Sequence, residues 1–376
     1  MGCCLHFCRT NGTSKQPNSQ LGEVNLKLFS LKELKVATED FFLGNKIGEG
    51  GFGPVYKVAN LDGTNVAIKV LSSQSTQGAT EFLSEITAIS DIVHENLVKL
   101  YGVCIERKSR ILVYNYLENN SLAQILLGAN RSNIQLNWRT RCKICIGVAR
   151  GLAFLHEEVE PHIIHRDIKA SNILVDKDFT PKISDFGLAK LLPPNATHVS
   201  TRVAGTTGYL APEYAIRGQV TRKSDVYSFG VLLLEIISGR SHTNTRLPDE
   251  DHFLLDRTWA LYEQGELERI IDATLSDDLD TEEACRFLKI GLMCTQDEAT
   301  LRPSMSTVLN MLNGLKDVDS IKISTPGLIS DFTQLKVGRK KANEFALSSS
   351  SATSNDESSG NPTHPSITFT AIVDRE

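Results

Sequence analysis

The sequence has no excess of basic residues and no long apolar run. Its 40 lysines and arginines stand against 45 aspartates and glutamates, which gives a formal net charge of −5. A nucleic-acid-binding protein needs a strongly basic face, so we expect no nucleic-acid partner. The most apolar stretch, Val226–Ile237, contains Glu235 and is shorter than the roughly 18 residues that a membrane-spanning helix needs. No charged and apolar leader opens the chain, so we expect no secretory signal.

The eight cysteines form neither a disulfide framework nor a complete zinc motif. Three of them, Cys3, Cys4 and Cys8, crowd the N-terminus, and the other five are scattered through apolar segments. Cys142 and Cys145 form a lone CxxC pair, whereas a structural zinc site would need a second pair of ligands. We therefore expect the five internal cysteines to be reduced residues of the core.

Composition divides the 376 residues into three parts. Residues 1–40 precede the core, and residues 41–316 carry dense apolar periodicity. Residues 317–376 form a C-terminal extension, which from about residue 338 is dominated by Ser, Thr, Asn, Gly and Pro and includes the serine run 348–351. This composition cannot bury enough apolar surface to offset its ordering entropy, so we predict disorder from about residue 338.

The apolar periodicity is strand-like in the first third of the core and helical afterwards. Alternation predicts a strand at Val66–Val70, and Asp62-Gly63 just before it is typical of a hairpin turn. Residues 226–237 are apolar on nearly every side, which predicts a buried helix. The predicted strands and helices fall at 55–58, 66–70, 79–90, 98–104, 111–116, 144–155 and 226–237. This order predicts an α+β chain with a small sheet lobe and a larger helical lobe.

Residues 48–53 read GEGGFG, and three interpretations of this GxGxxG spacing compete. A dinucleotide-binding turn needs a helix next and an acidic residue about 20 positions on. Here a strand-like segment follows, and Lys69 stands within the next strand. A Walker A loop needs Lys and then Ser or Thr after its last glycine, where this chain has Pro54. The pattern favours a glycine hairpin whose backbone approaches phosphates over an ordinary turn only if companion motifs are present.

Companion motifs are present. Lys69 is a cation within a sheet and needs an anionic partner, and Glu81 and Glu85 share one face of the helix predicted next, where surface salt bridges are the ordinary alternative. His165-Arg166-Asp167 and Asp185-Phe186-Gly187 come later, beside apolar segments. A lone aspartate in such a loop is usually solvated or caps a turn. The joint order and spacing of the motifs change that interpretation.

In this order the motifs resemble those of the eukaryotic protein kinases, and the resemblance covers about residues 41–316. It implies an antiparallel β-sheet N-lobe at 41–117 with one key helix, and a mainly helical C-lobe at 118–316. It also implies transfer of the γ-phosphate of ATP to protein hydroxyl groups, with Mg²⁺ or in its place Mn²⁺ as cofactor. Lys169, two residues after Asp167, implies serine and threonine acceptors and argues against a tyrosine kinase.

The same resemblance implies a role for each matching residue. Asp167 matches the base that accepts the hydroxyl proton, and Lys69 matches the lysine on the α- and β-phosphates. The catalytic set is Asp167, Lys69, Lys169 and Asn172, and the metal ligands are Asn172 and Asp185. The nucleotide-binding set is Ile47, Gly48, Glu49, Gly50, Gly51, Phe52, Gly53, Val55, Ala67, Lys69, Asn115 and Leu117. Structural or regulatory roles fall to Glu85, Tyr114, Arg166, Phe186, Thr201, Thr206, Glu213, Asp225 and Arg302.

Several of these roles are specific. Glu85 is favoured over Glu81 as the partner of Lys69, and Tyr114 is the residue beside the adenine pocket. Arg166 is expected to need an anion, which a phosphate on the activation loop would supply. The candidate acceptors are Thr197, Ser200, Thr201 and Thr206, with Thr201 favoured and Thr206 assigned to the substrate-positioning loop. The resemblance further implies that Asp225 anchors the backbone at 165–166, that Arg302 pairs with Glu213, and that Ile89, Leu100, His165 and Phe186 form an apolar spine.

Segments 29–38, 94–98 and 205–214 resemble plant receptor-like kinases. Segments 114–120 and 241–248 resemble a smaller set of kinases within that group. With no ectodomain or membrane span in the sequence, a receptor-like cytoplasmic kinase is predicted. The expected partners are ATP, protein substrates with Ser or Thr, and an upstream receptor kinase. A scaffold that binds receptor complexes without catalysis is the alternative, and the presence of Lys69, Asp167 and Asp185 argues against it.

The N-terminus predicts lipid anchoring. Gly2 matches a myristoylation site, and Cys3 and Cys4 match palmitoylation sites, which together supply the two signals that stable anchoring needs. The myristoylation motif asks for Ser or Thr at position 6, where this chain has His6, so acylation of Gly2 stays open. We expect the protein at the cytoplasmic face of the plasma membrane, with a cytosolic pool.

Overall fold

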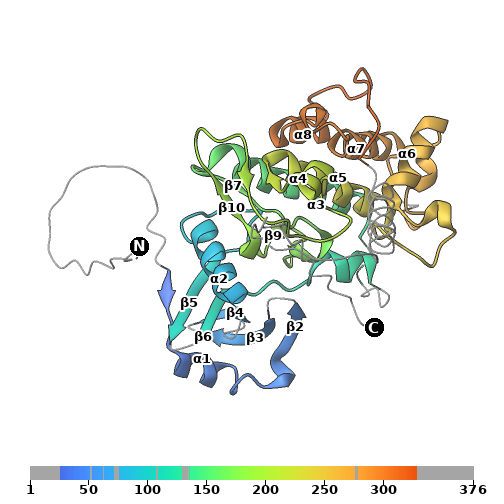
Figure 1. The fold of residues 1–376 in the computed structure, drawn as a ribbon. Coiled ribbons are helices and arrows are strands. Elements are labelled where there is room, and N and C mark those ends of the chain that lie inside the picture. Colours follow the sequence, from blue (N-terminus) through green and yellow to red (C-terminus); the bar gives the residue numbers. More distant parts are fainter. Residues whose placement is uncertain are drawn as a thin grey trace, which may run out of the picture.

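The computed structural model describes residues 26–50, 53–61, 63–71, 76–106, 109–128, 134, 136–275 and 278–327. These residues form two lobes, one built on a β-sheet and one built mainly from helices (Figure 1). The predicted α+β architecture, with a small sheet lobe and a larger helical lobe, is confirmed. The predictions for Gly2, Cys3, Cys4, Gly51 and Phe52, and for disorder from about residue 338, lie outside the described residues.

The N-lobe is a six-stranded sheet in the order β1-β5-β6-β4-β3-β2. Its strands are β1 (Lys27–Leu28), β2 (Lys46–Gly50), β3 (Gly53–Leu61), β4 (Thr64–Leu71), β5 (Leu100–Glu106) and β6 (Ser109–Asn115). The pair β1–β5 is parallel and the other pairs are antiparallel. Helix α2 (Thr76–Ile89) packs beside β4 and β6 and faces the C-lobe (Figure 1). The sheet and α2 therefore carry the N-lobe half of the candidate site.

The packed structure extends beyond residues 41–316 at both ends. Helix α1 (Leu31–Ala37) starts with a capping box between Ser30 and Glu33, and it buries Leu34 completely in the same apolar cluster as Ile68 of β4. At the other end Tyr227 donates a hydrogen bond to the carbonyl of Gly327 at 2.6 Å. Both flanking segments bury apolar surface against the lobes, because each carries apolar residues at the right positions to cover it.

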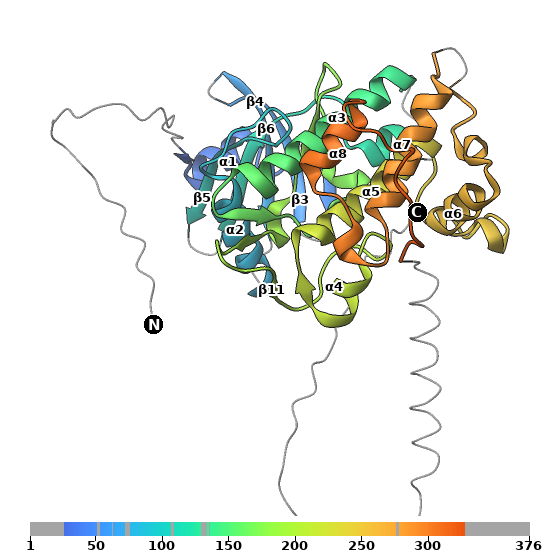
Figure 2. The same cartoon turned by 90° about the horizontal axis from the view of Figure 1, so that it is seen from above.

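The C-lobe is organised around helix α5 (Arg222–Ser238). Figure 2 shows α5 in the middle of this lobe, and it packs against α3, α6 and α7. The other helices are α3 (Trp138–Ala153), α4 (Pro212–Arg217), α6 (Leu254–Gln264), α7 (Thr281–Cys294) and α8 (Met305–Leu312). Every residue of α5 from Ser224 to Ser238 is buried, which confirms the prediction of a buried helix. In the part of the chain that the structure describes, no helix is long and apolar enough to cross a membrane.

Short elements between the lobes hold the loops that carry most of the predicted catalytic residues. Three two-stranded pairs are β7 (His162–Ile164) with β10 (Lys190–Leu192), β8 (Ile173–Val175) with β9 (Pro181–Ile183), and β11 (Val199–Ser200) with β12 (Gln219–Val220). Short 3₁₀ turns lie at Leu43–Asn45, Ala170–Asn172, Phe186–Leu188, Asp249–Asp251, Leu267–Ile270 and Ala299–Leu301, and π-helical turns at Ala123–Leu127 and Phe154–Glu158. The paired strands fix the ends of these loops, and the loop after β9 brings Asp185 to Lys69 of the sheet lobe.

Candidate active site

The glycine-rich segment is a hairpin between β2 and β3. Gly48 lies opposite Val55, and Gly50 lies opposite Gly53. Gly53 has a φ of 126°, and a Cβ built on it would lie 2.1 Å from the carbonyl oxygen of Val70, so no other residue fits there. A Cβ on Gly48 would meet nothing within 4 Å. A strand follows the glycines, so this is a hairpin and not the strand–turn–helix of a dinucleotide site.

The other predicted nucleotide contacts flank this hairpin and the segment that joins the lobes. Ile47 lies on β2 and is 39% exposed. Ala67 of β4 lies opposite Tyr114 of β6. Asn115 ends β6, its N–H donates to the carbonyl of Lys99 at 3.4 Å, and Leu117 follows it into the linker. The structure therefore distributes these residues over β2, β4 and the end of β6.

Lys69 lies between two carboxylates that come from distant parts of the chain. Its Nζ is 3.1 Å from Glu85 of α2 and 2.8 Å from Asp185, which follows β9. Burial by itself would lower the pKa of Lys69, but the charges of Asp185 and Glu85 outweigh it and hold that pKa above its ordinary value. Burial likewise opposes ionisation of Asp185, yet the charge of Lys69 holds the pKa of this carboxyl below its ordinary value. Lys69 and Asp185 are therefore both charged at neutral pH.

The hydroxyl of Tyr114 also contacts Glu85, a contact that the sequence motifs did not predict. The Tyr114 hydroxyl donates a hydrogen bond to Oε1 of Glu85, the oxygen that also accepts from the N–H of Phe186 at 3.4 Å. Burial and the neighbouring charge of Glu85 raise the pKa of Tyr114 well above its ordinary value, so the phenol stays protonated and remains a donor. The carboxylate of Glu85 is thus held by Lys69 of β4, by Tyr114 of β6 and by the backbone N–H of Phe186 in the loop after β9.

Asp167 is the centre of a second polar cluster, on the C-lobe side. Nδ2 of Asn172 donates to its Oδ2 at 2.9 Å, and Nζ of Lys169 is 3.0 Å from the same oxygen. The hydroxyl of Thr206 donates to Oδ1 of Asp167 at 2.8 Å and accepts from Nζ of Lys169 at 2.8 Å. The cluster therefore holds an aliphatic hydroxyl between one carboxylate and one ammonium group.

The backbone under Asp167 is anchored on α5. Asp225 accepts hydrogen bonds from the N–H of His165 at 2.7 Å and from the N–H of Arg166 at 2.8 Å. Nε2 of His156 lies 2.9 Å from the same carboxylate. Burial opposes ionisation of Asp225, but the hydrogen bond from His156 and the neighbouring donors hold its pKa below the ordinary value. This anchor keeps Arg166 at a φ of 73°, a left-handed conformation that non-glycine residues rarely adopt.

An apolar column connects α2 to the catalytic loop. Phe186 is completely buried, and its ring meets the ring of His165 edge-on at a centroid distance of 4.8 Å. Nε2 of His165 lies 3.0 Å from the carbonyl of Ser184. Ile89 and Leu100 are buried in the same core cluster. The column orders the Asp185 loop with its carboxylate turned toward Lys69.

The guanidinium of Arg166 is hydrogen-bonded to uncharged oxygens in the structure. Its guanidinium donates to the hydroxyl of Tyr214, with Nη2 at 2.5 Å and Nε at 3.2 Å, and to the carbonyls of Leu188 and Arg202 at 2.9 and 3.0 Å. Neutral oxygens thus satisfy the buried guanidinium without a phosphate. Tyr214 directly follows Glu213, at the end of the segment 205–214 that resembles plant receptor-like kinases.

Of the predicted phosphorylation sites, Thr201 lies next in the chain to a backbone partner of Arg166. The N–H of Thr201 donates to the carbonyl of Gly218 at 2.9 Å, and the next residue, Arg202, is a backbone partner of Arg166. Ser200 belongs to β11, and the Thr197 hydroxyl lies 3.2 Å from Nδ1 of His198. Among the described residues, Thr206 is the predicted acceptor whose hydroxyl donates to Asp167.

Glu213 of α4 and Arg302 form a bidentate ion pair. The two terminal nitrogens of Arg302 donate to the two carboxylate oxygens of Glu213 at 2.8 and 2.9 Å. Arg302 also donates to the carbonyls of Gln296 at 2.7 Å, Asp297 at 3.0 Å and Lys223 at 3.1 Å, and its side chain is fully buried. The pair fastens α4 to the segment before α8.

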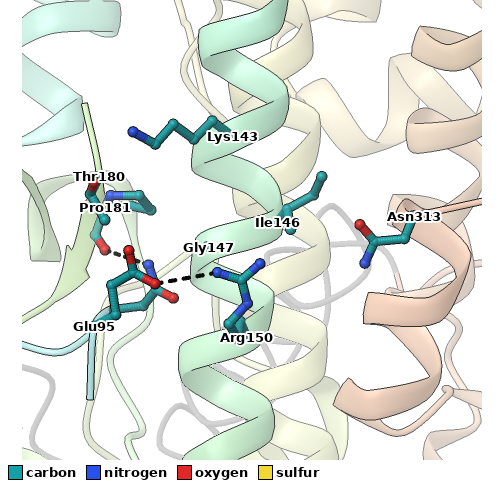
Figure 3. Close-up of a pocket in the computed structure, with 9 residues that line it drawn as sticks. Glu95, Lys143, Ile146, Gly147, Arg150, Thr180, Pro181 and Asn313 are labelled. Atoms are coloured by element: carbon teal, nitrogen blue, oxygen red, sulfur yellow. Dashed lines mark hydrogen bonds and ion pairs between the residues drawn. The ribbon is translucent and has the colours of Figure 1, made fainter. Parts of the chain in front are cut away.

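A cavity of about 270 Å³ lies elsewhere, on the C-lobe beside α3 (Figure 3). Arg150 and Glu95 form an ion pair at its rim at 3.6 Å, and the amide of Asn96 donates to the carbonyl of Pro181 at 3.1 Å. None of the predicted site residues lines it. The cavity is therefore separate from the clusters of Lys69 and Asp167.

The donor groups between the lobes fit a magnesium ion. Among the described residues, no three or more His, Cys, Asp and Glu side chains gather into a metal cage. Mg²⁺ instead keeps water and substrate phosphates and takes one or two protein oxygens. Asp185 supplies a carboxylate and Asn172 an amide oxygen, and the N–H of Ser184 holds the two loops together by donating to the carbonyl of Asn172 at 2.9 Å. Such oxygen donors are the type that Mg²⁺ prefers.

The two-lobed fold, the glycine hairpin and the paired clusters of Lys69 and Asp167 define a protein kinase. A family model described as protein tyrosine and serine/threonine kinase matches residues 41–312. The chain belongs to this family.

The relatives place the chain in a narrower group. It is 63% identical over 339 residues to Cold-responsive protein kinase 1 of Arabidopsis thaliana, an alignment that covers 90% of this chain and 87% of that protein. It is 53% identical over 317 residues to a probable LRR receptor-like serine/threonine-protein kinase of the same plant. That alignment covers 84% of this chain and 30% of the receptor, so the chain spans less than a third of the receptor's length.

A second receptor of that plant, a probable leucine-rich repeat receptor-like serine/threonine-protein kinase, is 54% identical over 301 residues, again 30% of its length. The predicted kinship with plant receptor-like kinases is confirmed, including the narrower resemblance of segments 114–120 and 241–248 to the cold-responsive kinase. The chain is a protein serine/threonine kinase.

Proposed function

We propose that this protein transfers the γ-phosphate of ATP to serine and threonine hydroxyls of protein substrates. The observation that supports this proposal is the hydroxyl of Thr206, held at 2.8 Å by both Asp167 and Lys169. A substrate serine or threonine presents the same chemical group to the same carboxylate. Phosphoryl transfer needs a positioned hydroxyl and neutralised phosphate charge more than it needs covalent help.

Each charged residue has a part in this proposal. Asp167 orients the acceptor hydroxyl and takes up its proton. Lys69 binds the α- and β-phosphates, and Glu85 holds it in place. A Mg²⁺ ion bound by Asp185 and Asn172 would neutralise phosphate charge. Lys169 adds a cation beside the acceptor, within 3.0 Å of Asp167.

The test is phosphate transfer from labelled ATP to myelin basic protein by the purified full-length chain. We expect labelled phosphoserine and phosphothreonine with MgCl₂ or MnCl₂, and loss of transfer to background when EDTA removes the metal. The measurement is phosphoamino-acid analysis of the product. Phosphotyrosine as the main product would contradict the proposal, and so would an absence of transfer by a chain that binds ATP, which is the behaviour of a scaffold.

We propose further that the chain phosphorylates its own activation loop at Thr201. Thr201 precedes Arg202, whose carbonyl is one of the oxygens that occupy Arg166. A phosphate there offers this arginine a charged partner, which makes a stronger hydrogen bond than a neutral carbonyl. Mass-spectrometric mapping of the reaction above decides the point, because the proposal fails if Thr201 carries no phosphate in active wild-type protein.

Membrane attachment and upstream signalling complete the proposed function. We propose that acyl groups on Gly2, Cys3 and Cys4 hold the kinase at the cytoplasmic face of the plasma membrane, with a cytosolic pool. There it would receive signals from a receptor kinase in a stress response. The names of its relatives, a cold-responsive kinase and receptor-like kinases, support this setting.

The Gly2→Ala variant tests the anchor. Alanine cannot be N-myristoylated, so the chain keeps at most one of the two signals that stable anchoring needs. We expect the fraction recovered with plant cell membranes to fall at least fivefold relative to wild type, measured by fractionation and immunoblotting. The matched control is Gly12→Ala, which lies in the same segment outside the motif. Equal membrane fractions for wild type and Gly2→Ala would contradict the predicted role of Gly2.

A further inference from the structure

His242 lies on the loop after α5 and reaches back to a buried carboxylate of that helix. Its backbone N–H donates to Oε1 of Glu235 at 2.7 Å, and Nδ1 of its ring is 3.0 Å from the same oxygen. The Glu235 side chain is 1% exposed and that of His242 is 20% exposed. A carboxylate this deeply buried is stable only when donors surround it. The backbone and the ring of His242 supply two of these donors.

Tyr209 supplies the third donor and ties this carboxylate to the activation segment. Its hydroxyl donates to Oε2 of Glu235 at 2.5 Å, and its ring packs against the ring of His242 at a centroid distance of 4.6 Å. The carbonyl of Tyr209 accepts from the hydroxyl of Ser228, also on α5, at 2.7 Å. Burial and the charge of Glu235 raise the pKa of Tyr209 well above its ordinary value, so the phenol remains a donor. Tyr209 is thus held to α5 at both ends.

The ring of His242 also fills the space beside Gly208. Gly208 has a φ of 100°, and a Cβ built on it would lie 2.2 Å from Cδ2 and 2.4 Å from Nε2 of His242. One edge of the imidazole therefore faces Glu235, and the other lies directly against the loop backbone. The N–H of Tyr209 donates to the carbonyl of Thr206 at 3.2 Å, which closes the turn 206–209. Thr206 is the residue that bonds Asp167.

We infer that His242 is a positioning residue for the phosphate acceptor. With Glu235 and Tyr209 it forms a clamp under the turn 206–209, and this turn places Thr206 against Asp167. The inference rests on the proposed kinase function, because the acceptor peptide must pass this turn to reach Asp167. Without these contacts we expect the turn 206–209 to become more mobile, so that the acceptor hydroxyl is no longer held in one orientation. The nucleotide contacts around Lys69 belong to a different cluster and keep their geometry.

The test is a comparison of kinetics for the full-length chain and its His242→Ala variant. We expect the KM for myelin basic protein to rise about tenfold and the KM for ATP to stay within twofold of wild type. A tenfold change corresponds to about 1.4 kcal/mol, which is the size of one hydrogen bond to a charged group. His242→Asn restores the acceptor KM to within threefold, because its amide donates to Glu235. His252→Ala is the control, since the side chain of His252 lies 3.5 Å from the exposed Asp249.

Hydrogen exchange of the Tyr209 amide separates this inference from the proposed function. We expect this amide to exchange at least tenfold faster in His242→Ala than in wild type or His252→Ala. Faster exchange upholds the clamp even if the wild type transfers no phosphate, in which case the proposed function alone fails. Unchanged exchange in His242→Ala overturns the clamp. An unchanged acceptor KM in an active enzyme overturns it as well, and so does a rise in both KM values by the same factor.

Discussion

The Asp167→Asn variant is expected to transfer phosphate about 10³ times more slowly than wild type. General base catalysis contributes roughly 10²–10⁴-fold to a rate, and an amide cannot take up the hydroxyl proton. The substitution also places an NH₂ group among the donors of Asn172, Lys169 and Thr206, which now face the carboxylate. At least one donor then loses its acceptor, and the acceptor hydroxyl loses its orientation. Catalysis therefore fails at the position where the hydroxyl is held.

Nucleotide binding should survive this change, because Lys69 and Asp185 form a separate ion pair at 2.8 Å. The measurements are the initial rate of transfer to myelin basic protein and the dissociation constant of a fluorescent ATP analogue. The matched control is Asp178→Asn, an exposed aspartate that follows the same loop. A variant that keeps more than a tenth of the wild-type rate would remove Asp167 from the proposed role of base. A variant that loses nucleotide binding would show a wider structural defect instead.

The Arg302→Ala variant is expected to lose about 3–5 kcal/mol of unfolding free energy, the usual cost of breaking a buried ion pair on one side. Arg302 is fully buried, and it bonds both carboxylate oxygens of Glu213 and three backbone carbonyls. Its guanidinium also lies 5.0 Å from the ring centre of Tyr227. The alanine leaves these acceptors unpaired in a site from which water is excluded.

Two further variants make this stability prediction specific. Arg302→Lys should recover only part of the loss, because one ammonium group cannot reproduce the fork of donors that meets Glu213. Arg269→Ala removes an exposed pair with Glu266, whose side chains are 56% and 45% exposed, and should cost less than about 1 kcal/mol. Thermal and urea unfolding of all three variants measure the differences. A shift for Arg302→Ala no larger than that for Arg269→Ala would contradict the structural account of this pair.

Short motifs made most of the site predictable. Lys69, Asp167 and Asp185 stand in local patterns whose residue types follow from the chemistry of phosphate and metal binding. The roles assigned to them stay predictions until activity is measured. Helix positions were predictable for the same local reason, since α5 carries apolar residues on every side and is buried on every side. Local sequence patterns therefore predict both the secondary-structure elements and the residues with the expected chemistry.

Other features were not predictable from local patterns. The strands predicted at 98–104 and 111–116 are found at Leu100–Glu106 and Ser109–Asn115. Their ladder continues through polar residues to the pair Glu106–Ser109, because backbone hydrogen bonds do not require apolar side chains. The packing of α1 on the sheet was not predicted either. An amphipathic segment indicates that one of its faces is buried, but it does not indicate which surface covers that face.

The sequence by itself determined which groups can be charged, which can donate or accept hydrogen bonds, and which segments must be buried. Only the tertiary structure decided their partners. It brought Asp185 to Lys69 across 116 positions of the chain, and it placed the hydroxyl of Tyr214 against the guanidinium of Arg166. It also joined His242 to Glu235 next to the turn 206–209. The physical reason is that charge belongs to a single side chain, whereas pairing and desolvation depend on which distant surfaces pack together.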